Sequence, residues 1–364
     1  MESIGLRLSE TPVPHATADQ GQRAAIMSLP PFDVIRPRAL DAALEALWRH
    51  GAEAQVVAGG TDLVPSLKQR LFPPRVLVDI KGLRELDFIR AEPDQGVAIG
   101  ALTRISVLAK SPLLAQRFPV LSAAARTVAS PLLRNMGTLG GNLCLDTRCL
   151  YYNQSAFWRE SLGGCLKKDG TVCHVAPGGR FCWAVASGDT APALLALEAS
   201  IQLAGPNGLR ELPLREFFVN DGIVRVAKGH GELVTGVRIP ASSAGWSGAY
   251  KKLRIRQSID YPLAGVAAVM RKDAEGYCLE ARLALTAVNP APRLVNADLL
   301  RGKRYDPALV EQVAHEAIRT GKPLRTSAST PEYRRHMLRV FVRRALQELW
   351  LDNHPSALPP CGLP

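Results

Sequence analysis

The sequence predicts a folded protein of mixed α and β structure, in the α+β or α/β class. Short apolar runs typical of strands alternate with segments whose apolar residues recur at helical spacing. This rhythm stops at residues 146–186, which are rich in glycine, lysine, aspartate and aromatic residues. A loop of that length inside a compact domain is usually functional. The 364 residues, 47% hydrophobic and 21% charged, suffice for two or three domains with ample cores.

In the first half of the chain, ordered structure is expected to begin near Phe32, after a polar tail. Helices are predicted where apolar residues recur every three or four positions, and strands where short apolar runs end in turns. We therefore expect a helix over 39–48, strands at 56–58, 76–80 and 97–100, and helices over 105–108 and 121–128.

After the long loop the same two patterns return. We expect a helix over 192–199, strands at 200–204 and 233–239, a linker at 240–245, strands at 264–270 and 283–288, and helices over 310–319 and 333–349. The last helix is expected to be amphipathic, with many arginine residues on its polar face.

The composition narrows the class of protein. The net charge is +12, but lysine and arginine are scattered, so we expect no nucleic-acid partner; the charge would suit an acidic partner subunit or electron donor. No apolar run is long enough to cross a bilayer, so no membrane association is expected. The first residues lack a signal-peptide pattern and the seven cysteines are an odd number, which favours a reducing cytoplasm over a disulfide framework.

Two glycine-rich turns could hold a diphosphate. They are Val56, Val57, Ala58, Gly59, Gly60, Thr61, Asp62 and Leu63, and then Thr138, Leu139, Gly140, Gly141 and Asn142. Glycine lets successive backbone N–H groups approach an anion, and hydroxyl and amide side chains would add donors. Neither turn has the dinucleotide-binding or Walker pattern, and each alone is more often plain turn chemistry. Asp189 would either accept a ribose hydroxyl or cap the following helix.

Four further residues could hold a metal centre, because the long loop contains Cys149, Cys165, Cys173 and Cys182. Structural zinc sites usually supply close C-x2–4-C pairs, which this loop lacks, whereas iron–sulfur clusters tolerate varied spacings. Spacing alone leaves open both a metal centre and four unlinked thiols.

Three other cysteines and one histidine are also considered as metal ligands. Cys144 is a rival ligand by position, but it lies beside the second glycine turn and is expected to pack there. Cys278 is expected in a core and Cys361 in a tail. His174 follows Cys173, yet a lone histidine is more often polar surface.

Together these residues resemble the flavoprotein (medium) subunits of the molybdenum hydroxylase family, which includes xanthine and carbon monoxide dehydrogenases. The matching motifs are VVAGGTDL at 56–63, TLGGN at 138–142, Gly188 and Asp189 before APALLAL, and YKKLRIRQSIDYPLAGVAAV at 250–269. The likeness covers about residues 30–350. The cysteine loop, which most members lack, resembles that of one branch, the β subunits of 4-hydroxybenzoyl-CoA reductase.

The resemblance implies two cofactors, FAD and a [4Fe–4S] cluster. It places the FAD diphosphate on residues 56–63 and 138–142, with Cys144 at the flavin turn as a cysteine that does not bind metal. It implies that Asp189 contacts the ribose and Lys252 the flavin. The implied cluster ligands are Cys149, Cys165, Cys173 and Cys182.

The resemblance also implies a fold: a two-subdomain FAD-binding domain of the vanillyl-alcohol-oxidase type and a small α/β C-terminal domain. The expected parts are a tail at 1–28, subdomain 1 at 29–85, subdomain 2 at 86–240 with the iron–sulfur loop inserted at 146–186, the C-terminal domain at 245–351 and a tail at 352–364.

The function implied is electron transfer within a molybdenum enzyme that removes the hydroxyl of 4-hydroxybenzoyl-CoA. Electrons from a ferredoxin would pass through the cluster and FAD to two [2Fe–2S] clusters in a small subunit, and then to a molybdopterin-binding large subunit. A hetero-oligomer, such as a dimer of heterotrimers, and no catalytic acid–base residue in this chain are expected. Two alternatives stay open: the FAD subunit of an oxidising molybdenum hydroxylase, and a zinc-stabilised binding protein.

Overall fold

The computed structural model describes residues 29–351. The strands are β1 Asp33–Ile35, β2 Ala54–Val57, β3 Val76–Asp79, β4 Ile89–Ala91, β5 Val97–Gly100, β6 Ser200–Gly205, β7 Gly208–Pro213, β8 Leu233–Ile239, β9 Ser247–Leu253, β10 Ala264–Lys272, β11 Cys278–Thr286 and β12 Arg293–Val295. The α-helices are α2 Leu40–His50, α3 Leu63–Lys68, α4 Ile105–Lys110, α5 Pro112–Arg117, α6 Pro119–Thr127, α7 Pro131–Arg134, α8 Leu139–Leu143, α9 Ala156–Ser161, α10 Thr190–Ala196, α11 Leu214–Phe217, α12 Pro307–Thr320 and α13 Pro331–Leu351. Tails 1–28 and 352–364, with Cys361, lie outside the described residues.

The N-terminal sheet is a small parallel one with the strand order β1-β3-β2. Parallel neighbours need crossover connections, and α2 and α3 lie in those connections. Ala43 and Leu47 of α2 are buried with Val76 and Val78 of β3, which fixes the helix on the sheet. The first glycine turn therefore follows the carboxyl end of β2 and leads directly into α3.

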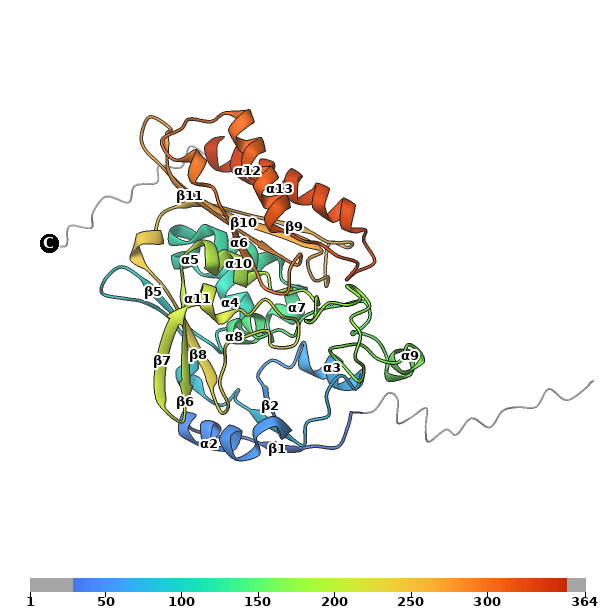
Figure 1. The fold of residues 1–364 in the computed structure, drawn as a ribbon. Coiled ribbons are helices and arrows are strands. Elements are labelled where there is room, and N and C mark those ends of the chain that lie inside the picture. The colour runs from blue at the N-terminus through green and yellow to red at the C-terminus, as the bar shows by residue number, and fades with distance from the viewer. Residues whose placement is uncertain (1–28, 352–364) are drawn as a thin grey trace, which may run out of the picture.

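The second sheet is antiparallel, with the order β4-β5-β8-β6-β7. Helices α4, α6, α8 and α10 lie between it and the C-terminal sheet (Figure 1). Ile99 of β5, Leu121 of α6 and Leu194 of α10 belong to one buried cluster that joins this sheet to the helix layer. The second glycine turn opens α8 and so starts within this layer.

The C-terminal sheet is antiparallel, with the order β12-β11-β10-β9, and has helices on both faces. In β10, Ala267 and Val269 belong to the cluster shared with the helix layer, while Ala268 and Met270 belong to the cluster under α12 and α13. Successive side chains of a strand point to opposite faces, so β10 contributes to two cores at once. Figure 1 shows α12 and α13 as the outer layer.

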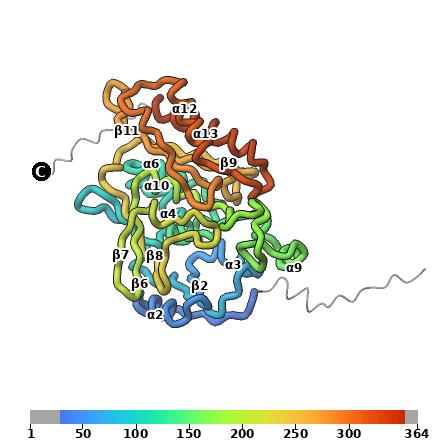
Figure 2. Tube along the Cα trace, in the orientation of Figure 1, coloured from blue at the N-terminus to red at the C-terminus, as the bar shows by residue number. Residues whose placement is uncertain are grey.

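The cysteine loop, residues 146–186, lies between the N-terminal part of the chain and the C-terminal sheet, as the green segment of Figure 2. Its one helix is the short α9. The N–H of Leu150 donates to the carbonyl of Thr326 at 2.8 Å, and that of Ala186 to the carbonyl of Asn289 at 3.0 Å. Arg159 of α9 donates to the carbonyls beyond α3. The loop is thereby attached to both ends of the fold.

Most expected elements are present, with shifted bounds. The predicted helix over 192–199 begins at Thr190 and ends at Ala196, and the predicted strand at 283–288 begins at Cys278. The segment expected as a linker includes a 3-10 turn at Ala241–Ser243. The prediction that the arginines of the last helix lie on its polar face is wrong for Arg334, which is fully buried. Within residues 29–351, no helix is long and apolar enough to span a bilayer.

Candidate functional site

The two glycine turns lie against each other. A Cβ atom added at Gly59 would overlap the backbone carbonyl of Met136, just before the second turn. Gly60 has a φ of 69°, a left-handed conformation that side chains disfavour, so it also has to be glycine. The two turns therefore form one region in which glycines let the backbone segments pack closely. Such a region suits a ligand that runs along N–H groups, as a diphosphate does.

The second turn is held by its own polar side chains. The Thr138 hydroxyl accepts the N–H of Gly141 at 3.2 Å, at the start of α8. The Asn142 side-chain oxygen accepts the N–H of Thr190 at 3.1 Å and its hydroxyl at 2.6 Å. Gly140 packs so closely on Ala101 that an added Cβ would lie 2.9 Å from the Ala101 Cβ. These contacts position the turn and leave only part of its polar groups for a ligand.

Asp189 and Lys252 form a buried ion pair. The Lys252 ammonium donates to Asp189 Oδ2 at 2.9 Å and to the carbonyl of Thr127 at 3.0 Å, and the Tyr250 hydroxyl donates to Asp189 Oδ1 at 2.8 Å. The two charged side chains are 4% and 3% exposed. Burial raises the pKa of Asp189 and lowers that of Lys252, and the attraction between the two charges opposes both shifts.

The alternative that Asp189 caps the following helix is wrong. Asp189 does occupy the position before Thr190, but its side chain makes no capping hydrogen bond. Asn142 supplies the oxygen that accepts the Thr190 N–H instead. The predicted ribose contact of Asp189 stays a prediction, as does the flavin contact of Lys252.

A pocket beside the second glycine turn contains a polar group that sequence reasoning missed. It is lined by Asn142 and Gly188 of the expected FAD motifs, together with Ser187 and Arg225. Within the described residues, the buried Ser187 hydroxyl has no hydrogen-bond partner. An unpaired buried hydroxyl is costly unless a ligand or water satisfies it. The Ser187 hydroxyl and the Asn142 amide, beside the second glycine turn, therefore fit part of a nucleotide such as FAD. No spacing or motif marked Ser187 in the sequence.

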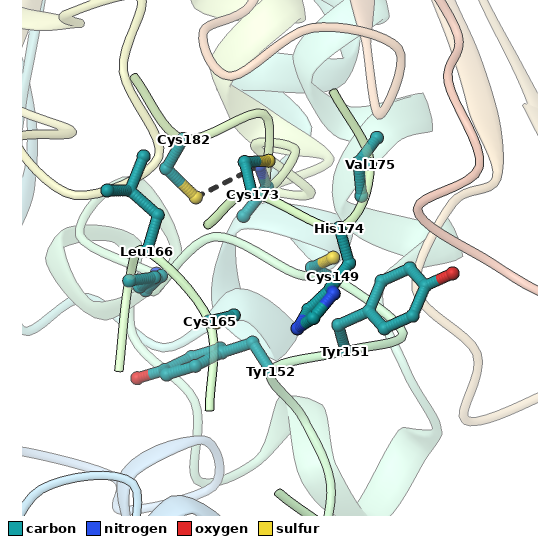
Figure 3. A pocket seen from close by; sticks show the side chains of 11 residues that line it. Cys149, Tyr151, Tyr152, Cys165, Leu166, Cys173, His174, Val175 and Cys182 are labelled. Carbon is teal, nitrogen blue, oxygen red and sulfur yellow. Dashed lines mark hydrogen bonds between the residues drawn. The ribbon is translucent and has the colours of Figure 1, made fainter. Parts of the chain in front are cut away.

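The four loop cysteines come together in the structure. Cys149, Cys165, Cys173 and Cys182 line one pocket with Tyr151 and His174, as Figure 3 shows. Each cysteine is between 5% and 8% exposed, and all four are free thiols. Four separate stretches of one irregular loop thus bring four sulfur atoms to a common pocket.

Burial in the pocket favours the neutral, protonated form of the thiols. Burial raises the pKa of Cys149 to about 12 and that of Cys182 to about 11. Backbone N–H groups oppose this, and that of Ala184 lies 3.4 Å from the Cys182 sulfur. Thiolates so deeply buried require a compensating cation, and metal binding would displace their protons.

The sulfur atoms do not converge on one point. Within residues 29–351, no group of three or more His, Cys, Asp or Glu side chains is placed to hold a metal ion. A single zinc would draw four sulfurs to about 2.3 Å from one centre. In a cluster each thiolate instead binds its own iron, so the ligands surround a larger object. Four thiols are a donor set that both zinc and iron–sulfur clusters use.

A buried lysine lies beside the cysteines. The Lys167 ammonium donates to Asp146 Oδ1 at 2.7 Å and lies 4.3 Å from the centre of the Tyr152 ring, while the Tyr152 hydroxyl donates to Asp146 Oδ2 at 2.8 Å. Burial lowers the pKa of Lys167, and Asp146 opposes this shift. Sequence reasoning missed this group, because only the fold brings Asp146 to Lys167.

The remaining candidates are placed as follows. Cys144 ends α8 and packs against the central core, outside the cysteine-lined pocket. Cys278 is fully buried under the C-terminal helices, as predicted. His174 lines the pocket, and its Nε2 lies 2.6 Å from the carbonyl oxygen of Gly164, so the expectation of plain polar surface is wrong.

Asp62, expected in the diphosphate turn, has partners from two other parts of the chain. It forms an ion pair with Arg148, directly before Cys149, and accepts the Tyr261 hydroxyl at 2.8 Å. Arg148 donates to the Tyr261 oxygen at 2.6 Å, and its guanidinium lies 4.2 Å from the centre of that ring. Sequence reasoning missed Arg148 and Tyr261.

Several known proteins are similar to this chain over most of its length. The carbon monoxide dehydrogenase medium chain of Hydrogenophaga pseudoflava is 32% identical over 88% of this chain and 98% of its own length. The aldehyde oxidoreductase FAD-binding subunit of Escherichia coli is 34% identical over 71% of this chain and 81% of its own length. A crystal structure of Cu,Mo-CO dehydrogenase includes a chain with a TM-score of 0.74 and 28% identity, covering 89% of this chain and 99% of that one.

Two family descriptions match nearly all of the described chain. Residues 30–242 match the FAD binding domain in molybdopterin dehydrogenase, and residues 248–349 match the CO dehydrogenase flavoprotein C-terminal domain. The fold is accordingly the mixed α and β FAD-binding fold of the CO dehydrogenase medium subunit, followed by a C-terminal domain. The chain belongs to the family of FAD-binding flavoprotein subunits of the molybdopterin dehydrogenases, the molybdenum hydroxylases.

Proposed function

We propose that this chain is the electron-transfer subunit of a molybdenum hydroxylase complex and carries a [4Fe–4S] cluster in addition to FAD. The family supports the flavin. The observation that carries the cluster is the common pocket of Cys149, Cys165, Cys173 and Cys182. The iron–sulfur cluster would supply one-electron transfer to and from the flavin.

The residues proposed for FAD are the two glycine turns, residues 56–63 and 138–142, with Asp189 and Lys252 nearby. Backbone N–H groups of the turns would bind the diphosphate, and Ser187 would donate to or accept from the nucleotide part. Asp189 and Lys252 already form an ion pair with each other. We therefore propose that they contact the cofactor together, as a polar pair with no net charge.

The direction of electron flow has two candidates. Relatives named as carbon monoxide, 6-hydroxypseudooxynicotine and glyceraldehyde dehydrogenases support an oxidising enzyme, whose partner subunits would deliver electrons to this chain. The cysteine loop favours the second candidate, a 4-hydroxybenzoyl-CoA reductase in which electrons run the other way. The relatives support the family without singling out this reductase branch.

The proposed partners follow from the medium chains and subunits of larger enzymes to which this chain is similar. They are a molybdopterin-binding large subunit, a small subunit with two [2Fe–2S] clusters, and a ferredoxin that exchanges electrons at the loop. Reconstitution of the complex separates the directions. Reduction of ferredoxin by an aldehyde or N-heterocycle would favour the oxidising enzyme, and ferredoxin-driven dehydroxylation of 4-hydroxybenzoyl-CoA would favour the reductase.

A count of flavin and metals in anaerobically purified protein tests the proposal. We expect about one FAD and about four irons per chain, with a brown-yellow colour. Protein with stoichiometric zinc and no iron would instead support a zinc-stabilised loop. Protein with FAD but no metal, even after reconstitution with iron and sulfide, would contradict the cluster and leave the family membership intact.

A further inference from the structure

One arginine joins the cysteine loop to the first glycine turn. Arg148 directly precedes Cys149, and its backbone exchanges two hydrogen bonds of 2.8 Å with Val185. Its side chain leaves this loop and pairs with Asp62 in the turn between β2 and α3. Both side chains are mostly buried, at 19% and 20% exposed. The contact therefore links two segments that are far apart in the sequence and belong to the two proposed cofactor sites.

The charge of Asp62 makes this contact necessary. A carboxylate within a turn that is proposed to bind a diphosphate would repel that anion. Arg148 neutralises the carboxylate, and the Tyr261 hydroxyl donates a second hydrogen bond to it. The Tyr261 ring also lies against the guanidinium, which holds the guanidinium in place. Within the described residues, the buried Arg148 Nε has no partner, so the group keeps one donor unused.

We propose that Arg148 is a positioning residue for FAD: it cancels the charge of Asp62 and fixes the Gly59–Leu63 turn against the segment that carries Cys149. The inference rests on the proposed function, since it takes FAD to bind at that turn. Without Arg148 the turn keeps its glycines but presents an uncompensated carboxylate toward the diphosphate.

The test is a double-mutant cycle on the full chain, purified anaerobically with its iron and then stripped of FAD. The dissociation constant of FAD is measured by flavin fluorescence for the wild type, Arg148→Met, Asp62→Asn and the double variant. Arg148→Met should weaken FAD binding about tenfold, the size expected for losing one charge-assisted pair. The double variant should recover most of this loss, because the repelling carboxylate is gone.

Two further variants separate charge from shape. Arg148→Lys should lie between the wild type and Arg148→Met, since lysine keeps the charge but not the planar fork that stacks on Tyr261. Arg180→Met, at an exposed arginine in the same loop, is the matched control and should bind FAD as the wild type does. Should Arg148→Met fail to fold, Arg148→Lys and the double variant still decide the question.

Each outcome bears on the inference. An unchanged dissociation constant in Arg148→Met, with iron intact, overturns it alone. A double variant as weak as Arg148→Met also overturns it, because charge cancellation would then not be the cause. Wild-type protein that binds no FAD overturns the proposed function and this inference together, and the cofactor count of the wild type shows which has failed.

Discussion

The four cysteines of the pocket are both buried and of a donor type that binds soft metals. Because burial raises the pKa of Cys149 and Cys182, these thiols hold their protons at neutral pH until a metal displaces them. Loading with iron should therefore release protons and become more favourable as pH rises. Serine cannot replace a soft thiolate at such a site.

Cys165→Ser should remove most of the iron and leave FAD bound, because the residues proposed for FAD lie outside the pocket. Iron analysis and absorbance of the released flavin measure the two cofactors in one sample. The control is Cys144→Ser, since Cys144 lies near the loop but not in the pocket. Full iron in Cys165→Ser, or loss of iron in Cys144→Ser, would refute the ligand assignment.

Arg334 is a buried cation with only neutral partners in the described chain. It donates to the carbonyls of Leu263 at 2.7 Å, Leu324 at 2.9 Å and Ala287, and to the Thr326 hydroxyl at 3.2 Å. Burial lowers the pKa of Arg334 to about 10. Arg334 thus provides hydrogen-bond donors to the carbonyls of three separate segments below α13.

Arg334→Met should destabilise the fold by about 3 kcal/mol, because several buried carbonyls lose their donor at once. Urea unfolding followed by circular dichroism measures the change. Arg344→Met, on the exposed side of the same helix, should change stability by less than about 0.5 kcal/mol. Equal effects of the two substitutions would show that the buried contacts contribute little.

Among the elements, α9 fixes the cysteine loop to the N-terminal part of the fold. Its buried Arg159 donates to the carbonyls of Gln69 and Arg70, both at 3.0 Å, and Leu71 packs with Cys149 and Cys165 in one cluster. The short helix α9 therefore holds the cysteine loop against the carboxyl end of α3. The loop has little other regular structure.

Arg159→Met should release α9 and expose the loop to proteases. We expect cleavage between residues 156 and 182 to become several-fold faster and iron to be lost more readily on exposure to a chelator. Limited proteolysis with mass spectrometry measures the first effect, and Arg180→Met serves as the control. Unchanged cleavage would mean that the loop is held by its other contacts, such as that of Leu150 with Thr326.

At the β6-β7 side of the five-stranded sheet, the ion pair between Arg210 and Glu232 should depend on pH. Arg210 of β7 donates to Glu232 at 2.8 Å, which lowers the pKa of Glu232 below its ordinary value of 4.5. A lowered pKa in the folded state adds stability above the unfolded pKa, and this is lost as pH falls through the folded pKa. Since the Arg210 side chain is 43% exposed, the contribution is about 0.5 kcal/mol.

Glu232→Gln should therefore be less stable than the wild type by about 0.5 kcal/mol at pH 7, and the difference should disappear as pH falls through the lowered folded pKa of Glu232. Urea unfolding across a series of pH values measures it. A difference that persists or grows at low pH would contradict the assigned ion pair.

How far the sequence predicts these elements depends on how strongly each is patterned. β8 is found at its predicted bounds, since most of its residues are apolar and buried. β7 was not predicted, because its residues are exposed and polar, and β9 was not, because its small and charged residues hide a buried strand. Composition cannot tell that Arg334 faces inward.

At the site, the types of residue in the sequence predicted more of the chemistry than did their positions along the chain. The cysteine spacing left open both a common metal centre and four unlinked thiols, and the glycine turns predicted a backbone surface suited to a diphosphate. The pairs Arg148 with Asp62 and Lys167 with Asp146 could not be predicted, because each joins segments that only the tertiary fold brings together. The orphaned hydroxyl of Ser187 was equally hidden, since serine occurs in most loops.

On the scale of the whole molecule, the C-terminal sheet is a middle layer. Its inner face packs on α6 and α10, and its outer face on α12 and α13. Ala267, Val269 and Ala284 of this sheet belong to the central core of the FAD-binding part. The two matched family regions therefore share one continuous core.

Truncation after residue 245 should leave α6 and α10 with an exposed apolar face, so the shortened chain should aggregate or bind hydrophobic dyes. Size-exclusion chromatography and dye fluorescence measure this against the full chain. A monodisperse fragment that retains FAD would show that the FAD-binding part is stable by itself.

The hydrogen bond from Leu150 to Thr326 has a consequence for biogenesis. During synthesis, all four cysteines leave the ribosome long before the segment around residue 326 does. This contact of the cysteine loop can therefore form only after residue 326 has been synthesised. On the proposed function, assembly factors acting on the nascent chain before that point would meet a cysteine loop that still lacks this contact.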